Sequence, residues 1–281
     1  MLARYNFSQP LRTLSSRFIV LSQIEPIYDE SNCNFAYQLR WGLTIFWQKS
    51  ADESHWYEAL VESLADQGIR ILSWRWKRTN VLQFAMSTVP TVSPARIVKN
   101  VREVLQSQIR NIPHAALRQR YAIRSFGTQE RTIVEAYIAN QPSHHPMATN
   151  LAQELFESLA LDDAHVDLSQ PRHANGGIFW YNLHIAMVYF GRWRCTNREW
   201  LVKTQNAVVA TSQKKHWRLS RLSLVADHLH FSVGCSLEES PLEVVLSVMN
   251  NIAWMHEMKS VLSYSAFMGT FGEYDQRSVV A

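Results

Sequence analysis

The feature that most constrains the fold of this chain is an internal repeat. Four pairs of segments match in the same order: Tyr37-Gln38-Leu39 with Tyr181-Asn182-Leu183, residues 79–86 (TNVLQFAM) with 226–233 (ADHLHFSV), Ser93-Pro94 with Ser240-Pro241, and Phe126-Gly127 with Phe271-Gly272. Their offsets are similar, and the second and third pairs share one offset without a gap. An ordered series of this kind is typical of the tandem duplication of one supersecondary unit.

Each copy alternates strand-like and helix-like patterns. In the first copy the expected order is a strand over 35–47, a helix over 50–68, an extended segment over 69–86, a helix opened by Ser93-Pro94, a strand over 121–126, and a helix ending near Asn140 before Pro142. In the helix over 50–68, Ser50 is the expected N-cap, Glu53 its capping-box partner, and Gly68 the C-cap residue. This order predicts an α+β fold of two ferredoxin-like (RRM-like) domains, each with an antiparallel sheet and helices on one face.

The repeat also predicts the domain organisation. We expect an N-terminal extension over 1–34 with a strand-like run at Arg17–Leu21, a first domain over 35–146, a linker over 147–176, and a second domain over 177–281. The linker carries a helix-like pattern from Ala148 to Leu161.

Composition excludes several classes of protein. A hydrophobic content of 47% with 19% charged residues is globular, and the net charge of +4 permits a polyanionic partner without requiring one. Three cysteines without CxxC spacing predict neither a disulfide framework nor a zinc site. No apolar run approaches the length of a membrane span, so we expect a soluble, cytoplasmic protein without a membrane partner.

His228 and His230 provide the first chemical signal. They are separated by one residue in a β-prone run, so their side chains would project from one face of a strand. Two imidazoles can hold one metal ion, but a working site needs a further donor and a group that does chemistry. The alternative is a half-buried strand with two hydrogen-bonded histidines.

Several motifs together resemble the single-tyrosine HUH transposases, the small DNA nicking and joining enzymes of simple insertion sequences and their REP-associated relatives. The resemblance rests on Tyr181-Asn182-Leu183-His184, on Asp227-His228-Leu229-His230-Phe231 followed by Ser240-Pro241, on Gly269-Thr270-Phe271-Gly272, and on Tyr137-Ile138-Ala139-Asn140-Gln141 in the first copy. It covers both copies, and its most specific part is the histidine strand followed by Ser-Pro.

The resemblance implies roles for four residues. His228, His230 and Gln141 would bind a divalent metal, Mg²⁺ or Mn²⁺, and Tyr137 would attack the DNA backbone to leave a 5′-phosphotyrosine and a free 3′-hydroxyl. The spacing of Tyr137 and Gln141 puts them one turn apart on a helix face. Asp227 would fix a neighbouring donor or cap the strand end.

The two copies depart from the family pattern in complementary ways. Val81 and Gln83 stand at the histidine positions of the first copy, and the position that would match Tyr137 in the second copy is 282, whereas the sequence ends at Ala281. In many members of the family the active site is shared across a homodimer. The sequence therefore predicts a fused pseudo-dimer, monomeric in solution, with one composite site made from Tyr137 of one copy and the histidines of the other.

Each of these residues also has a plainer interpretation. Tyr137 could be the buried aromatic of an amphipathic helix, and Gln141 a polar residue before Pro142. His144-His145 could bind metal, but a histidine pair in a loop is usually solvated.

Several residues are candidates for contact with single-stranded or hairpin DNA. Trp74, Arg75, Trp76, Lys77 and Arg78 interleave aromatic and basic side chains on a strand, and Arg124, Arg192 and Arg194 are further candidates, with Arg118, Arg120, Lys214 and Lys215 as less specific ones. Period-2 geometry puts the two tryptophans on one face, where they either stack on bases or pack within the sheet.

The sequence leaves three classes of function open. The first is a metal-assisted tyrosine DNA nickase or strand-transfer enzyme. The second is a catalytically inactive, domesticated transposase that binds nucleic acid, and the third is a structural module that uses its aromatic residues as core.

Overall fold

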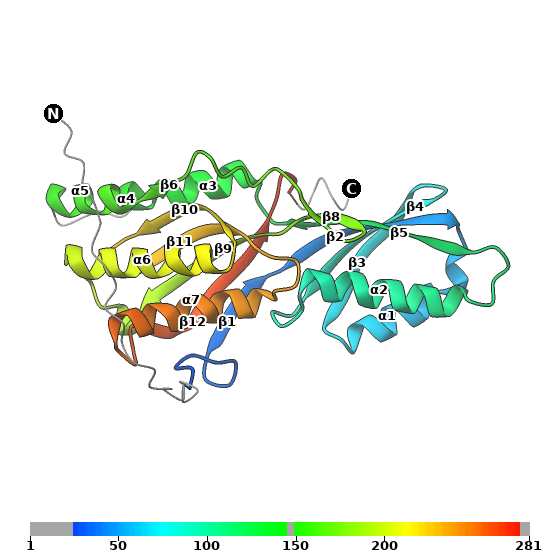
Figure 1. Ribbon diagram of the computed structural model, residues 1–281, viewed down its shortest axis with the longest axis horizontal. Coiled ribbons are helices and arrows are strands. Elements are labelled where there is room, and N and C mark those ends of the chain that lie inside the picture. Colours follow the sequence, from blue (N-terminus) through cyan, green and yellow to red (C-terminus); the bar gives the residue numbers. More distant parts are fainter. Residues whose placement is uncertain (1–24, 145–148, 276–281) are drawn as a thin grey trace, which may run out of the picture.

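Two six-stranded sheets lie end to end along the long axis of the molecule (Figure 1). The computed structural model describes residues 25–144 and 149–275. The strand-like run predicted at Arg17–Leu21 lies outside the described residues.

The two copies have the same topology. The first contains β2(Arg40–Lys49), α1(Tyr57–Ala65), β3(Ile69–Arg78), β4(Val81–Thr88), α2(Pro94–Ile109) and β5(Ala116–Phe126), and the second contains β9(Asn182–Tyr189), α6(Arg198–Lys214), β10(Arg218–Leu224), β11(His228–Gly234), α7(Pro241–His256) and β12(Leu262–Phe271). Their antiparallel cores are ordered β3-β4-β2-β5 and β12-β9-β11-β10. This βαββαβ arrangement confirms the tandem duplication and the ferredoxin-like class.

The extended segment predicted at 69–86 is a hairpin of two strands, β3 and β4, that turns at Thr79 and Asn80. The hairpin adds a second strand between the two helices of each copy. The predicted strict alternation of strand and helix is therefore wrong. Two adjacent strands joined by a two-residue turn give one continuous β-prone run, so the pattern alone did not separate them.

Caps fix where the helices begin. The Ser93 hydroxyl accepts from the Arg96 amide, and Ser240 and Glu243 form a reciprocal capping box at the start of α7. Both predicted Ser-Pro starts are confirmed. The predicted start at Ser50 is wrong, because Asp52 caps a short 3₁₀ helix, η1(Glu53–His55), and α1 begins only at Tyr57.

Each sheet receives a strand from the other copy. β1(Asn34–Gln38) pairs in parallel with β12, whereas β8(Gly177–Trp180) pairs in parallel with β5 and carries β7(Arg172–Ala174) at its edge. The predicted single strand over 35–47 therefore divides at Leu39 into strands of two different sheets. The sheets are mixed rather than purely antiparallel, because the exchanged strands run parallel to their neighbours.

The two Phe-Gly turns cross at the junction of the halves. Ser125 Oγ donates to the Phe271 carbonyl at 2.7 Å, and Thr270 Oγ1 donates to the Phe126 carbonyl at 2.7 Å. A Cβ at Gly127 or Gly272 would clash with a backbone carbonyl of the opposite turn. Glycine is therefore required at both turns, since the two backbones approach too closely for any side chain.

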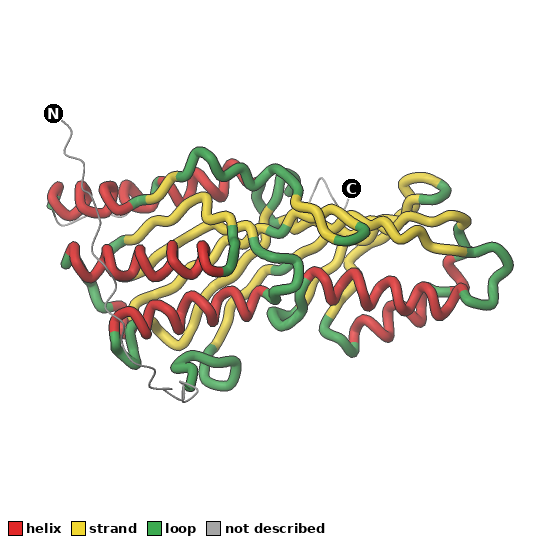
Figure 2. The backbone as a smooth tube through the Cα atoms, in the orientation of Figure 1, coloured by secondary structure: helices red, strands yellow, loops and turns green. Residues whose placement is uncertain are grey.

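The two sheets differ in how their faces are covered. Helices α1 and α2 cover one face of the first sheet, and α6 and α7 cover the corresponding face of the second. The other face of the second sheet lies under α3(Arg131–Ala139), α4(Gln141–His144) and α5(Asn150–Leu159), whereas the strands of the first have helices on one side only among the described residues (Figure 2).

The linker and the helix before it differ in detail from the prediction. The linker helix predicted over Ala148–Leu161 is confirmed as α5, and β6(Leu161–Asp162) then pairs with β10. Helix α3 ends at Ala139, and Pro142 lies in the first turn of the next helix, α4, rather than in a loop. Proline is tolerated there because the first-turn amides have no partner within the helix.

Candidate active site

The candidate site lies where helix α3 of the first half crosses the sheet of the second half. After β5 the chain passes Gly127 and runs over β10 and β11 (Figure 1). The buried Glu135 carboxylate accepts from Ser220 Oγ at 2.8 Å and from Arg131 at 2.7 Å, and Ser220 Oγ lies 2.8 Å from Ser232 Oγ. This polar network holds α3, which belongs to the first half, on the sheet of the second half.

Tyr137 projects from α3 toward the histidines of the second half. Its ring meets the ring of His230 at a centroid distance of 5.6 Å and an interplanar angle of 89°, and the ring of His184 at 5.9 Å and 74°. The side chain is 46% exposed, so the interpretation of Tyr137 as a buried core aromatic does not hold. The fold thus brings Tyr137 and His230 together from opposite halves of the chain.

His228 and His230 lie on β11 with ring centroids 5.0 Å apart. His230 is buried, and His228 is half-buried with its Nδ1 2.7 Å from Oδ1 of Asp227. Arg192 also donates to Asp227, at 3.2 Å. Burial raises the pKa of Asp227, but the hydrogen bonds from His228 and Arg192 outweigh it, so the pKa lies below its usual value. A charged Asp227 therefore holds Nδ1 of His228 as the protonated nitrogen.

His184 is a member of the cluster to which sequence reasoning gave no role. From β9, its Nε2 lies 2.9 Å from Nδ1 of His230, with the ring centroids 5.2 Å apart and the ring planes inclined by 25°. The ring of Phe267 packs edge-on against it at 5.7 Å. Burial lowers the pKa of His184 to about 4, so the ring is neutral at pH 7.

The strand pairing identifies the residue of the first half that corresponds to His184, and it differs from the one given by the sequence match of Tyr37 with Tyr181. In the second half, His184 pairs with Ser232 on one side and Gly269 on the other. The equivalent positions in the first half are Ala85 and Arg124, and both pair with Gly42. Gly42 is therefore the structural counterpart of His184. The alignment of Tyr37 with Tyr181 is therefore two residues out of structural register. The correct register shows that the first half lacks all three histidines, with glycine, valine and glutamine in their places.

The remaining predicted ligands lie beside Tyr137. Gln141 is buried, and its Nε2 donates to the Tyr137 carbonyl at 3.3 Å. His144 is exposed on α4 with its ring 6.3 Å from that of Tyr137, and His145 lies outside the described residues. Within 25–144 and 149–275, no group of three or more His, Cys, Asp or Glu side chains is arranged to hold a metal ion.

The predicted nucleic-acid residues of β3 divide between two faces. Trp74 packs on Trp56 at 5.4 Å and Trp76 on Trp47 at 5.6 Å, which favours sheet packing over base stacking for both. Arg75, Lys77 and Arg78 are exposed.

The other predicted arginines lie nearer the second half. The Arg124 guanidinium lies 4.6 Å from the Trp180 ring. Arg192 and Arg194 are exposed in the loop after β9, where Phe190 is 51% and Trp193 is 54% exposed. These two exposed aromatic residues were not singled out from the sequence.

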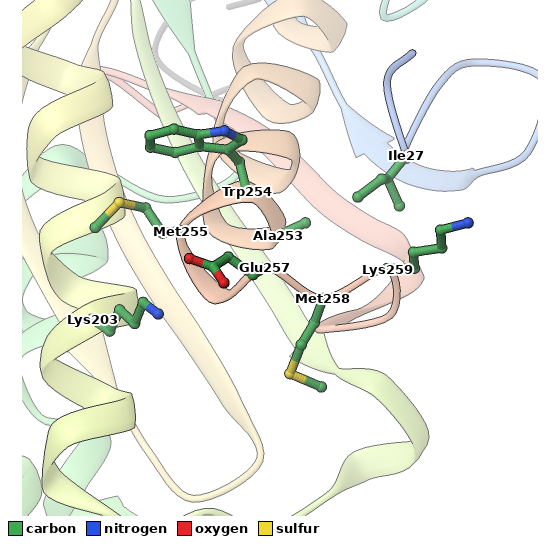
Figure 3. A pocket seen from close by; sticks show the side chains of 8 residues that line it. All are labelled: Ile27, Lys203, Ala253, Trp254, Met255, Glu257, Met258 and Lys259. Carbon is green, nitrogen blue, oxygen red and sulfur yellow. The ribbon is translucent and has the colours of Figure 1, made fainter. Parts of the chain in front are cut away.

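A separate shallow hollow at the end of α7 is shown in Figure 3, lined by Ile27, Lys203, Ala253, Trp254, Met255, Glu257, Met258 and Lys259. None of the predicted site residues lines it. Its charged groups have opposite signs, and Trp254, which is 63% exposed, is the most exposed tryptophan of the chain's described part. The hollow therefore offers a reference tryptophan away from the candidate site.

The fold and the cluster define an α+β protein of two ferredoxin-like units with a histidine and tyrosine cluster at their junction. The chain matches no protein-family model and no curated protein. Among solved structures it is similar to a proposed glycine cleavage system transcriptional repressor (9% identity, 83% of this chain and 98% of that one, TM-score 0.22). It is also similar to a microcompartment protein from Desulfitobacterium hafniense DCB (9% identity, 86% and 98%, TM-score 0.20).

Neither similarity bears on function, and the fold assignment rests on the strand order itself. Among the described helices, none combines the length and apolar character needed to cross a membrane.

Proposed function

We propose that this protein is a metal-assisted tyrosine DNA nickase of the HUH type, with one composite active site. Tyr137 of the first half is the nucleophile, and His228 and His230 of the second half are the metal ligands. The single observation that carries the proposal is the edge-on contact of the Tyr137 and His230 rings at 5.6 Å. Tyr137 and His230 are 93 positions apart in the sequence and come from different halves, yet their rings lie in contact.

The donor set suits a divalent metal. Asp227 holds Nδ1 of His228, which leaves the lone pair of the neutral ring on Nε2, the arrangement usual for a metal-ligating histidine. Two imidazoles and the amide oxygen of Gln141 would make a nitrogen and oxygen shell that favours Mg²⁺ or Mn²⁺. When bound, the ion would act as a Lewis acid on the scissile phosphate.

The residues of the chain perform the covalent step. The Tyr137 Oη attacks the phosphorus, the bond from phosphorus to the 3′-oxygen breaks, and a 5′-phosphotyrosine forms. The phenol proton leaves to solvent and the departing 3′-oxygen takes up a proton, so charge and atoms balance. Attack by a 3′-hydroxyl reverses the step and joins the strands. The exposure of Tyr137 supports this role, because the phosphate must reach the phenol from outside.

The open face of the first sheet supports single-stranded DNA as the substrate. The strands β2, β3, β4 and β5 together contain nine Arg and Lys residues and no Asp or Glu. Arg75, Lys77 and Arg124 come from alternate positions facing away from α1 and α2. A sheet face with one sign of charge can contact a phosphate backbone without reading its sequence.

The loop over residues 190–194 (FGRWR) supplies a second contact for an unpaired strand. It adjoins the histidine strand, because Arg192 donates to Asp227 beside His228. Trp193 is braced edge-on by Trp200 at 5.3 Å and remains half in solvent. An exposed, braced indole between two arginines suits stacking on a base.

A gel assay for covalent attachment tests the proposal. Labelled, hairpin-bearing single-stranded DNA is incubated with the protein and Mn²⁺, and Tyr137→Phe and His228→Ala are compared with the wild type. Tyr37→Phe is the matched control, since Tyr37 is 45% exposed and pairs with Met268, on the opposite face of the sheet from Phe267 and the histidines. We expect an adduct with the wild type and the control, and none with the other two variants.

Two results would contradict the proposal. An adduct that persists in Tyr137→Phe would mean another nucleophile. Intact DNA binding without an adduct in any protein would instead support the catalytically inactive, nucleic-acid-binding alternative.

A further inference from the structure

His184 contacts the candidate site but has no role in the proposed function. It lies in the cluster but holds no position that the family pattern assigns to a ligand. Its ring lies edge to edge with the ring of His230, with a contact of 2.9 Å between Nε2 of His184 and Nδ1 of His230. That distance requires one of the two nitrogens to carry a proton and the other a lone pair.

The two possible proton positions have opposite consequences. If Nδ1 of His230 donates to His184, the lone pair of His230 is on Nε2, the nitrogen farther along the ring from its backbone. If Nε2 of His184 donates instead, Nδ1 of His230 is the acceptor, its Nε2 carries the proton, and neither nitrogen can serve a metal.

His228 indicates which arrangement the site uses. Its Nδ1 is held by Asp227, so its lone pair is on Nε2. We infer that His184 is the positioning residue for His230, accepting the Nδ1 proton so that both histidines of β11 direct an Nε2 lone pair to the metal; this inference rests on the proposed function.

The surroundings of His184 are those of a fixed acceptor. Its ring is packed edge-on by Phe267 at 5.7 Å and by Tyr137 at 5.9 Å. The side chain is held from three sides by rings of three different elements, β11, β12 and α3. A ring fixed in this way can set the orientation of the imidazole that is hydrogen-bonded to it.

The first half supplies an independent argument. Gly42 occupies the position of His184, and Val81 and Gln83 occupy those of His228 and His230. The glycine leaves no side chain for Gln83 to meet, and Gln83 Nε2 donates instead to Thr44 Oγ1 at 3.3 Å. All three histidines are thus present in one half and absent from the other, as expected if they act as one unit.

Nitrogen NMR of the histidine rings tests the inference on the metal-free protein. In the wild type we expect His230 as the tautomer protonated at Nδ1. His184→Gln keeps an acceptor oxygen near the same place and should preserve that tautomer, whereas His184→Leu removes the acceptor and should give a mixture. A wild-type His230 protonated at Nε2 would overturn the inference without any variant.

Mn²⁺ titration of the same proteins gives the second readout. Loss of an outer-shell partner typically weakens metal affinity about 10- to 100-fold. We expect a loss of this size in His184→Leu and recovery to within about threefold of the wild type in His184→Gln. Equal affinity in all three proteins would overturn the positioning role. Near-ultraviolet circular dichroism identifies a variant that has not folded, in which case the wild-type tautomer decides.

The inference and the proposed function fail differently. A wild-type protein with the expected tautomer but no Mn²⁺ binding and no adduct would contradict the nickase while leaving the hydrogen bond from His230 to His184 intact. A wild type that binds Mn²⁺ and forms the adduct, with His184→Leu unchanged in both readouts, would contradict only the role of His184.

Discussion

The two halves of this protein share one topology but use the same sheet face differently. In the second half that face carries His184, His228 and His230 and lies beneath α3 from the first half. In the first half the equivalent face carries Gly42, Val81 and Gln83, has no helix over it among the described residues, and is basic. The comparison teaches that one sheet topology can present either a histidine cluster under a helix or an open basic face, depending on the side chains of that face and on the element that covers it.

The largest difference is expected from paired substitutions at equivalent positions of the two sheets. His230→Ala should reduce covalent DNA attachment about 1000-fold, because a metal ligand contributes several kcal/mol to the transition state. Gln83→Ala, its counterpart in the first half, should leave attachment unchanged. Quantified adduct formation under single-turnover conditions measures both, and equal losses in the two variants would show that the halves do not differ in chemistry.

The anchoring of α3 gives the next largest effect. Glu135→Ala removes a buried carboxylate from Arg131 and Ser220, and we expect the free energy of unfolding to fall by about 1–3 kcal/mol. Glu103→Ala in the first half breaks only an exposed pair with Lys99 and should cost less than about 0.5 kcal/mol. Urea denaturation followed by tryptophan fluorescence compares them. If Glu135→Ala were as stable as Glu103→Ala, the helix would be held by other contacts.

The open basic face should affect DNA affinity more modestly. The double variant Arg75→Ala, Lys77→Ala should bind single-stranded oligonucleotide several-fold more weakly, and the slope of log affinity against log salt should fall by about 1.4 if each side chain neutralises one phosphate. Arg96→Ala, Lys99→Ala removes two exposed cations from α2 on the opposite side and serves as the control. Fluorescence anisotropy at several salt concentrations is the measurement. Equal salt slopes for the two double variants would assign binding to overall charge.

The exposed loop aromatic can be compared with the reference tryptophan of Figure 3. Trp193→Ala should weaken binding of the same oligonucleotide by about 5- to 100-fold, whereas Trp254→Ala should leave it unchanged. The upper part of that range applies if the indole stacks on one base throughout binding. Binding is measured in a Tyr137→Phe background without metal, so that cleavage does not contribute. Equal effects from both tryptophans would remove the loop from the DNA contact.

The smallest effect concerns acid stability. Burial, with a further contribution from Lys203, lowers the pKa of His256 to about 4, and its Nε2 lies 2.9 Å from Thr204 Oγ1. Since the folded state keeps this ring neutral, its stabilising contribution is complete above about pH 6.5 and is lost as pH falls toward 4. The corresponding position in α2 is the buried Ile109.

His256→Gln should therefore lower the dependence of the melting temperature on pH between 6.5 and 4, which differential scanning calorimetry measures. His184 contributes in the same direction, so part of the dependence should remain. An unaltered pH profile in His256→Gln would mean that other groups control the acid stability of the second half.

Much of the architecture followed from the sequence because its signals are local. The Ser-Pro helix starts, the strand carrying His228 and His230, and the duplication itself depend on caps, on period-2 spacing and on ordered matches along the chain. The resemblance to the HUH transposases also predicted that Tyr137 and the histidines of β11 should be considered together.

Only the tertiary structure decided how the halves combine. The pairing of β1 with β12 and the crossing of the two glycine turns join segments more than a hundred residues apart, and the pairing of β8 with β5 joins strands from different halves. No local sequence pattern encodes these contacts. The packing of Trp74 on Trp56 and of Trp76 on Trp47 depended on which face of β3 received the helices. His184 emerged only from the true strand register, because a shift of two residues preserves the face of a strand while changing its partners.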